Sequence, residues 1–377
     1  MEAHAPYQAD SEIHGDISMN AAKNHPLKEA LYIASLATAT PPSSVSQCHA
    51  KEVLSRRFAD TLTPRSLALL RKLLDHPSIK QRYYAHEDPE SILSETPDDR
   101  IARFTRWAVD LSAEAATKAL ALAGLDISDV SGLVVNTCTG YICPGISTYL
   151  IERMGLRRTT PVYDLVGSGC GGAIPNIQVA GALLSGLADG VVISISVEIC
   201  SATFQIGNDL SLLLSNALFG DGAAAVVLWK RPSGLELVAS SSYYAPEHRE
   251  SIRYVHKNGQ LHNHLSTKLP GLVKDAAAEV VEALLAPRKL RARDIAHWAI
   301  HPGGEKILNA VGDKLGLEES QLRASRKILE HYGNMSSPTA LYVLEEIMGN
   351  GLNAGELCLM VAFGAGLSAH ALLLQKK

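Results

Sequence analysis

The sequence predicts an α/β protein built from two related halves. Along its 377 residues, short apolar runs of strand length alternate with helical patterns, which is typical of layered helices and sheets. Similar segments also recur along the chain, at an offset of 294 − 129 = 165 residues in one place and 363 − 219 = 144 residues in another. We therefore expect a flexible leader at 1–26, a first half at 27–235 and a second half at 236–377.

The repeat is clearest around two matched stretches. The helix-and-strand pattern of 115–137 returns at 280–302, with Asp129 matched to Asp294 165 residues later. A second repeated motif pairs Phe219-Gly220-Asp221-Gly222-Ala223 with Phe363-Gly364-Ala365-Gly366-Leu367. Chance matches between unrelated strand–helix segments are the alternative, but the shared register favours duplication.

The repeat predicts which residues meet. The 165-residue offset relates Gly169-Cys170 to Asn334-Met335, and Asn136 to His301. We expect Cys170 and Asn334 on equivalent strand-to-helix turns that face one cleft, with His301 at a strand end close to both.

Composition excludes several classes of protein. Lys and Arg total 35 against 39 Asp and Glu, so the net charge of -4 gives no electrostatic basis for binding nucleic acid or an anionic membrane. Residues 1–24 lack the apolar segment of a secretory signal, and the longest apolar runs are too short to span a bilayer. The six cysteines form no CxxC spacing, which favours free thiols in a cytoplasmic protein.

Cys170 is the candidate nucleophile. It follows an expected strand at 161–166 and precedes an expected helix at 173–187, within Gly167-Ser168-Gly169-Cys170-Gly171-Gly172. The positive end of a helix dipole favours a thiolate, and flanking glycines allow close approach of a substrate. A buried structural cysteine is the alternative.

The same glycines also match a dinucleotide-binding pattern. Gly167, Gly169 and Gly172 fit GxGxxG, and the acidic Glu198 ends the next strand-like run. A nicotinamide-dependent oxidoreductase is therefore a remote alternative. It is disfavoured because the pattern lies in mid-chain and Cys170 stands where a pyrophosphate would pack.

His301 and Asn334 are the candidate partners of Cys170. His301 follows an expected strand at 295–300 and precedes Pro302-Gly303-Gly304, which places the imidazole at the carboxyl edge of a sheet, where ligands bind. Asn334 precedes an expected helix at 338–348, where it could simply be a helix cap. His262 and His264 form an HxH pair without a third nearby ligand, so we predict no metal site.

This combination of side chains suits thioester chemistry without a cofactor. A thiolate can accept an acyl group, while an imidazole N–H and an amide can both donate to one thioester oxygen. Loss of CO2 from a malonyl thioester leaves an enolate at that oxygen, and each preorganised donor is worth about 2.7–4 kcal/mol if it acts like an oxyanion-hole group. The enolate carbon then attacks the acyl group on Cys170.

These motifs resemble the type III polyketide synthases, the chalcone-synthase-like branch of the thiolase fold. The resemblance runs from about Leu27 to the C-terminus and is carried by the Gly-rich stretch around Cys170, Ile300–Gly304, Tyr332–Ser337 and Leu218–Ala225. It implies a thiolase-like duplicated αβαβα layered fold with two pseudo-twofold-related halves. It also implies catalytic roles for Cys170, His301 and Asn334, and a gating role for Phe219.

The resemblance further implies a homodimer that uses acyl-CoA and malonyl-CoA. A coenzyme A site is expected near the basic residues Arg71, Lys72, Lys80 and Arg82 and at Gly303 and Gly304, although the charges could equally belong to a solvated helix face. Glu198 and Ser336 match positions near the cyclisation site. Substrate-binding positions are expected at Phe219, Cys138, Thr139, Cys143, Glu198, Cys200, Thr203, Phe363 and Ser336.

Two stretches of the sequence refine this expectation. The runs 196–205 and 265–270 resemble bacterial members that accept long fatty acyl starters, so we expect an alkylresorcinol or alkylpyrone synthase. The loop Ala362–Gly366 departs from the plant-type Gly-Phe-Gly-Pro-Gly, so its rigidity can differ. A chalcone- or naphthalene-forming enzyme and a ketoacyl synthase III-like enzyme remain alternatives, and a catalytically inactive lipid-binding scaffold would lack the Cys, His and Asn set.

Overall fold

The strands of the main sheet follow an order that is nearly symmetric about the centre of the sheet. The computed structural model describes residues 30–377, in which nine strands follow the order β11-β12-β13-β8-β1-β7-β6-β4-β5. Read outward from the centre, β1-β7-β6-β4 on one side corresponds to β8-β13-β12-β11 on the other. The strands β6, β4 and β5 run parallel on one side, β12 and β11 run parallel on the other, and the remaining pairs are antiparallel.

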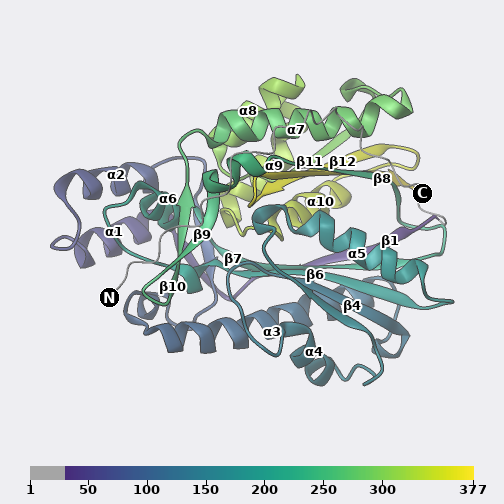
Figure 1. Cartoon of the computed structure of the whole chain (residues 1–377), viewed down its shortest axis with the longest axis horizontal. Coiled ribbons are helices and arrows are strands. Elements are labelled where there is room, and N and C mark those ends of the chain that lie inside the picture. The colour runs from purple at the N-terminus through teal and green to yellow at the C-terminus, as the bar shows by residue number, and fades with distance from the viewer. Residues whose placement is uncertain (1–29) are drawn as a thin grey trace, which may run out of the picture.

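The strands of the first arm are β1 (Tyr32–Ala39), β4 (Val130–Asn136), β5 (Val162–Leu165), β6 (Val191–Ile199) and β7 (Asp221–Trp229). Those of the second arm are β8 (Leu235–Tyr244), β11 (His297–Ile300), β12 (Leu357–Gly364) and β13 (Ser368–Lys376). Only two residue pairs join β1 to β8, so the arms separate into two stacked layers (Figure 1).

Helices fill the space between these layers and cover both outer faces. Figure 1 shows α5 (Ala173–Ser185) and α10 (Thr339–Gly349) between the two arms. Below lie α3 (Pro97–Leu122) and α4 (Ile146–Met154), and above lie α7 (Leu269–Leu285) and α8 (Glu305–Leu315). The expected alternation of helix and sheet layers is therefore present.

Most of the remaining elements lie at one end of the molecule. They are the helices α1 (Gln47–Arg57), α2 (Pro64–Leu74) and α6 (Leu210–Leu218), the antiparallel pair of β2 (Ser43–Ser46) and β3 (Gln81–Tyr84), and the hairpin of β9 (Ile252–Lys257) and β10 (Gln260–Leu265). The helix α9 (Glu319–Tyr332) packs against α10 and β11. In Figure 1, α1 and α2 project from the layered body beside α6.

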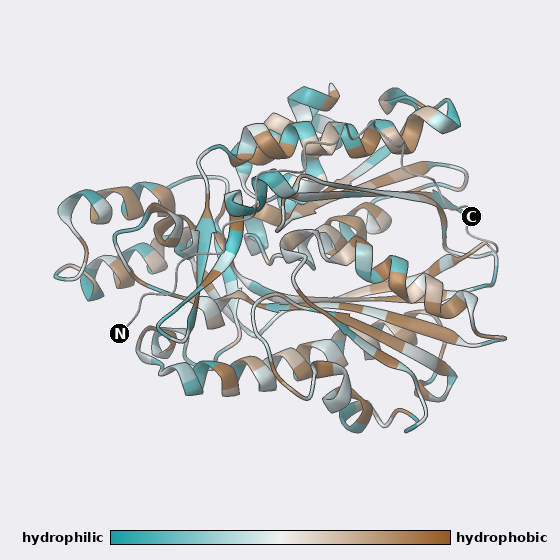
Figure 2. Ribbon diagram, viewed as in Figure 1, coloured by the Kyte–Doolittle hydropathy of each residue, from teal (hydrophilic) through white to brown (hydrophobic). Residues whose placement is uncertain are grey.

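Burial explains the layering. One hydrophobic cluster surrounds α5 and α10, and two others lie beneath α3 and α7, so both faces of each arm pack against apolar helix surfaces. Figure 2 shows the strands of the lower arm coloured apolar over most of their length. Helix starts follow local signals: Thr96 and Asp99 form a capping box at α3, with Pro97 in its first turn.

Two details differ from the sequence expectations. Asn334 follows the helix α9 rather than a strand, because the second arm has no counterpart of β5. The strand before His301 begins at His297, not at 295. The expected leader lies outside the described residues, and the division into halves at 235 and 236 stays a prediction.

Removing buried volume from the middle layer should lower stability. Ile177 on α5 is 0% exposed, so Ile177→Ala should reduce the free energy of unfolding by about 2–5 kcal/mol. Leu122, the last residue of α3, is 69% exposed, and Leu122→Ala should change it by less than about 0.5 kcal/mol. Urea unfolding measures both variants, and similar small losses in the two would contradict this packing.

Candidate active site

Cys170 lies on a tight turn between β5 and α5. The turn is a 3₁₀ segment, Gly169–Gly171, and Cys170 is 8% exposed. Gly169 has a φ of +56°, which favours glycine, and a Cβ on Gly364 would lie 2.2 Å from the Ser168 carbonyl oxygen. The end of β12 therefore packs directly on the backbone of this turn, and the close approach requires the small residues.

Glu198, at the end of β6, connects the two arms beside this turn. It is 0% exposed and accepts six hydrogen bonds. Four come from the loop that follows β4, and two come from the turn that precedes α10. The donors and their distances are Thr137 Oγ1 (3.1 Å), Cys138 N (2.9 Å), Thr139 N (3.1 Å), Thr139 Oγ1 (2.9 Å), Ser336 Oγ (3.3 Å) and Ser337 Oγ (2.7 Å).

Asn334 is held by backbone bonds to the end of α6. Its N–H donates to the Leu218 carbonyl at 3.0 Å, and its carbonyl accepts from the Gly220 N–H at 3.0 Å. The side-chain Oδ1 accepts from the Ser336 N–H at 2.7 Å, and Nδ2 lies 3.5 Å from the Gly303 carbonyl. Ser336 adopts a φ of +61°, an uncommon conformation for a residue with a side chain.

His301 follows β11 and is completely buried. Its backbone N–H donates to the Val361 carbonyl at 2.8 Å, while neither ring nitrogen has a hydrogen-bond partner among the described residues. The ring meets Phe363 edge-on, with centroids 5.2 Å apart. Burial lowers the pKa of His301 to about 3, so the imidazole is neutral at physiological pH and one of its nitrogens carries a proton to donate.

Cys170 differs from the sequence expectation of a thiolate stabilised by a helix end. Burial raises its pKa to about 11, and the negative charge of Glu198 acts in the same direction. Hydrogen bonds from Ser336 and Asn334 oppose this effect and lower the pKa. Desolvation outweighs the dipole of α5, so the resting group is a thiol that must lose its proton when it reacts.

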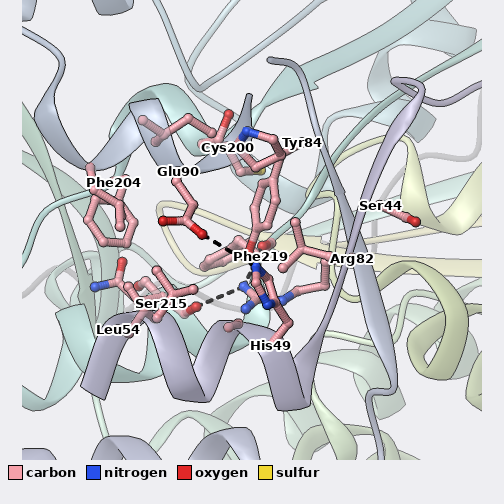
Figure 3. A pocket seen from close by; sticks show the side chains of 18 of the residues that line it. Ser44, His49, Leu54, Arg82, Tyr84, Glu90, Cys200, Phe204, Ser215 and Phe219 are labelled. Atoms are coloured by element: carbon pink, nitrogen blue, oxygen red, sulfur yellow. Dashed lines mark hydrogen bonds and ion pairs between the residues drawn. The ribbon is translucent and has the colours of Figure 1, made fainter. Parts of the chain in front are cut away.

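Two cavities meet at Phe219. A small cavity of about 30 Å³ is lined by Cys170, Cys138, Ser336 and Phe219, among others. A larger cavity of about 240 Å³ is lined by Phe219, Cys200 and Thr203. Figure 3 shows Phe219 and Cys200 at this larger cavity, opposite Leu54 of α1. Phe219 therefore separates the cysteine from a pocket that extends toward the α1 helix.

Of the expected substrate-binding residues in the loop after β4, Cys138 and Thr139 lie at the site and Cys143 does not. Cys138 Sγ lies 3.4 Å from Ser336 Oγ, and Thr139 is occupied by its bonds to Glu198 and to the Ile199 N–H. Cys143 is exposed and lines none of these cavities.

Among the residues expected at the coenzyme A site, the basic side chains of α2 lie away from the cavities and the two glycines lie at the site. Arg71 and Lys72 are exposed on α2 and also line none of the cavities, with Arg71 Nε bonded to Ser55 Oγ at 3.0 Å. Gly303 and Gly304 do lie at the site, between Asn334 and the start of α8.

Sequence reasoning missed two residues at this site. Ser337 Oγ donates to the Glu198 carboxylate and accepts from Asn136 Nδ2 at the end of β4, and its position beside Ser336 was the only available signal. Tyr254, on β9, lines the cavity of Cys170, and nothing in the local sequence marks it.

The part of the chain that the structure describes contains neither a metal-binding cluster nor a helix that could span a membrane. Among residues 30–377, no group of three or more His, Cys, Asp or Glu side chains is arranged to hold a metal ion, so His262 and His264 have no such cluster. In the same part of the chain, no helix combines the length and the apolar character needed to cross a membrane.

Comparison with known proteins places the chain in a family. A family model described as FAE1/Type III polyketide synthase-like protein matches residues 26–243, and one described as chalcone and stilbene synthases, C-terminal domain, matches 236–376. A 3,5-dihydroxyphenylacetyl-CoA synthase of Streptomyces toyocaensis is 31% identical over 76% of this chain and 77% of its own length. A 1,3,6,8-tetrahydroxynaphthalene synthase of Streptomyces peucetius subsp. caesius is 30% identical over 91% of this chain and 92% of its own.

Solved structures agree with the fold. PKS-I from the brown alga Ectocarpus siliculosus superposes with a TM-score of 0.84 at 26% identity, covering 93% of this chain and 99% of that one. The tetrahydroxynaphthalene synthase of Streptomyces coelicolor A3(2) gives the same TM-score and identity, covering 92% and 99%. The expected thiolase-like layered fold is confirmed.

These matches define the class as an acyltransferase that catalyses decarboxylative condensation with malonyl-CoA. The chain belongs to the type III polyketide synthase family, which includes the chalcone and stilbene synthases. The names of the relatives given above do not include an alkylresorcinol or alkylpyrone synthase, so that finer assignment stays a prediction.

The hydroxyl of Ser336 should tune the reactivity of Cys170. Because its hydrogen bond favours the thiolate, Ser336→Gly should raise the pKa of Cys170 and move the pH profile of its alkylation upward by roughly one pH unit. Glycine suits the φ of +61° at this position, which limits backbone strain.

The measurement is the rate of iodoacetamide labelling of Cys170 from pH 6 to 11, followed by peptide mass spectrometry. Cys170→Ser gives the background from the other cysteines. An unchanged profile, or a shift to lower pH, would show that Ser336 does not stabilise the thiolate.

Proposed function

We propose that this enzyme loads a long-chain acyl starter from acyl-CoA onto Cys170, extends it with malonyl-CoA and cyclises the product to an alkylresorcinol or alkylpyrone. The observation that carries the starter assignment is the cavity of about 240 Å³ beyond Phe219. Most of its walls are apolar, and it begins at the small side chain of Cys200. The apolar wall residues come chiefly from α1 and the 89–94 turn: Ala50, Val53, Leu54, Ile92, Leu93 and Phe204.

The proposed chemistry assigns one role to each side chain. The Cys170 thiolate attacks the starter thioester and releases coenzyme A. A malonyl thioester then loses CO2 while His301 and Asn334 donate to its oxygen. The resulting carbanion attacks the acyl-Cys170 carbonyl, which forms the new carbon–carbon bond, breaks the carbon–sulfur bond and releases the Cys170 thiolate. The neutral state of His301 supports this role, because a neutral imidazole with free ring nitrogens can donate without a competing partner.

Desolvation supports the same assignment. His301 is 0% exposed and Asn334 is 2% exposed, so hydrogen bonds from these groups act in a medium of low dielectric. There, each donor stabilises a developing enolate more than it would in water. No additional cofactor is needed for the step, and coenzyme A thioesters enter only as substrates.

A second candidate is supported by the names of the relatives. Two of them are synthases of aromatic products, 3,5-dihydroxyphenylacetyl-CoA and 1,3,6,8-tetrahydroxynaphthalene. On that basis the alternative is a small starter and an aromatic product without a long side chain. Incubation with malonyl-CoA and acyl-CoA starters of two to sixteen carbons, with mass spectrometry of the products, separates the two: long alkyl products support the first and malonyl-only aromatics support the second.

We also infer a homodimer. Tyr141 is 74% exposed and Val166 is 61% exposed, and both border a cavity of about 590 Å³ on the outside of the Cys138 loop. Cys143 lies on the same exposed loop, so it can line a starter pocket only if a second copy covers it. A cytoplasmic location stays a prediction.

Asn334 should matter far more for decarboxylation than for acylation. Asn334→Ala should slow CO2 release from malonyl-CoA by roughly 100-fold, the cost typical of a lost oxyanion donor. Acylation of Cys170 by a non-extendable acyl-CoA should fall much less, because Ser336 still supplies the larger of the two side-chain hydrogen bonds that favour the thiolate. Asn334→Asp keeps an acceptor for the Ser336 N–H and so controls for loss of loop support. Equal losses in both half-reactions of both variants would assign Asn334 a structural role only.

Filling the cavity at Cys200 should shorten the preferred starter. A buried methylene contributes about 0.8 kcal/mol, so Cys200→Phe, by displacing about four methylenes, should cost roughly 3 kcal/mol for long chains. That corresponds to about a hundredfold loss in kcat/KM for long starters, with short ones unaffected. Ala68→Phe, exposed on α2, is the matched control. A uniform loss across chain lengths would indicate overpacking of the core and argue against an acyl tunnel.

A further inference from the structure

A buried arginine joins the loop of Phe219 to the loop of Asn334. Arg82, on β3, is 1% exposed. Its Nη1 donates to the carbonyls of Asn216 (2.8 Å) and Phe219 (2.9 Å), and its Nε donates to Gln47 Oε1 (3.0 Å). All three acceptors are neutral oxygens. These hydrogen bonds of the buried guanidinium therefore hold two backbone carbonyls and one side-chain amide in place.

The two backbone acceptors, the carbonyls of Asn216 and Phe219, lie at the C-terminal end of α6. An α-helix leaves its last four carbonyls without partners inside the helix. In α6 these groups are taken by Arg82, by Gln47 Nε2, which donates to the Ala217 carbonyl at 2.9 Å, and by the Asn334 N–H, which donates to the Leu218 carbonyl at 3.0 Å. A cation is also favoured at this negative end of the helix dipole. Arg82 and the backbone of Asn334 therefore cap the same helix end.

The aliphatic part of the same side chain packs against the residue before Asn334. A Cβ on Gly333 would lie 2.8 Å from Arg82 Cγ, and one on Gly220 would lie 3.4 Å from Arg82 Cβ. Gly220 in turn donates to the Asn334 carbonyl at 3.0 Å. Figure 3 shows Arg82 next to Phe219 in the wall of the larger cavity. Asn334 can shift only if the contacts of Arg82 change with it.

We propose that Arg82 is a positioning residue for decarboxylation: it holds the end of α6 so that the amide of Asn334 stays directed at the thioester oxygen. This inference rests on the role assigned to Asn334 under the proposed function. Arg82 touches no reacting atom in this account. Its effect passes through the backbone of Phe219, Gly220 and Asn334, and none of its hydrogen bonds reaches Cys170.

The test compares two half-reactions in Arg82 variants. Arg82→Met keeps most of the aliphatic packing but loses every donor, so malonyl-CoA decarboxylation should fall at least tenfold, while Cys170 acylation by a non-extendable acyl-CoA stays within about threefold of wild type. Arg82→Lys can still bond one carbonyl and should recover part of the loss. Arg82→Met combined with Asn334→Ala should be no slower than Asn334→Ala alone, because both changes disable the same donor.

Arg106→Met is the matched control, since Arg106 is about half exposed and paired with Glu87. If Arg82→Met does not fold, Gln47→Leu weakens the same support more gently and should show the same selective loss. Equal losses in both half-reactions, or additive losses in the double variant, would overturn the inference. Loss in Asn334→Ala without loss in the Arg82 variants overturns only the role of Arg82, whereas wild-type decarboxylation in Asn334→Ala overturns the proposed role of Asn334 as well.

Discussion

The buried carboxyl group of Glu198 is the interaction on which the geometry of the site depends. It is removed from solvent, and its six hydrogen bonds come from loops that belong to different arms of the sheet. A buried acidic group is costly unless donors surround it, so neither loop can move without leaving it unsatisfied. Burial raises the pKa of Glu198, while the bonds from Cys138, Ser337 and Thr139 lower it. The loops beside Cys170 and Asn334 are thereby fixed relative to each other.

The same desolvation determines the state of the catalytic groups. Burial disfavours a charge on both Cys170 and His301, which leaves a neutral thiol and a neutral imidazole. A dry site with neutral donors suits an enolate, whose charge appears only during the reaction. The thiol is the group that must change its protonation, and the hydrogen bonds of Ser336 and Asn334 reduce the cost of that change.

The repeat offset and the glycines predicted that Cys170, His301 and Asn334 meet, because both patterns reflect backbone constraints. The structure brings the Asn334 side chain within hydrogen-bond reach of Cys170, and the approach of His301 to this pair stays a prediction. The turn that carries Cys170 packs so closely against Gly364 that a side chain at that position would clash. The glycines that this contact requires can be seen in the sequence. The cavity beside α1 could not be predicted, since its shape depends on side chains that meet only after folding. The raised pKa of Cys170 was missed for a similar reason, because a local helix dipole is readable from sequence and the burial of a thiol is not. Cys143, expected in the pocket, is exposed in the single chain.

The central claim is that both arms of the fold converge on one thioester formed at Cys170. Intact-protein mass spectrometry after incubation with a non-extendable acyl-CoA, followed by peptide mapping, tests it most directly. The account predicts one acyl group per chain, located on Cys170 and absent from Cys170→Ser. An acyl group located instead on Cys138 or Cys200, the two other cysteines that line the adjoining cavities, would contradict it.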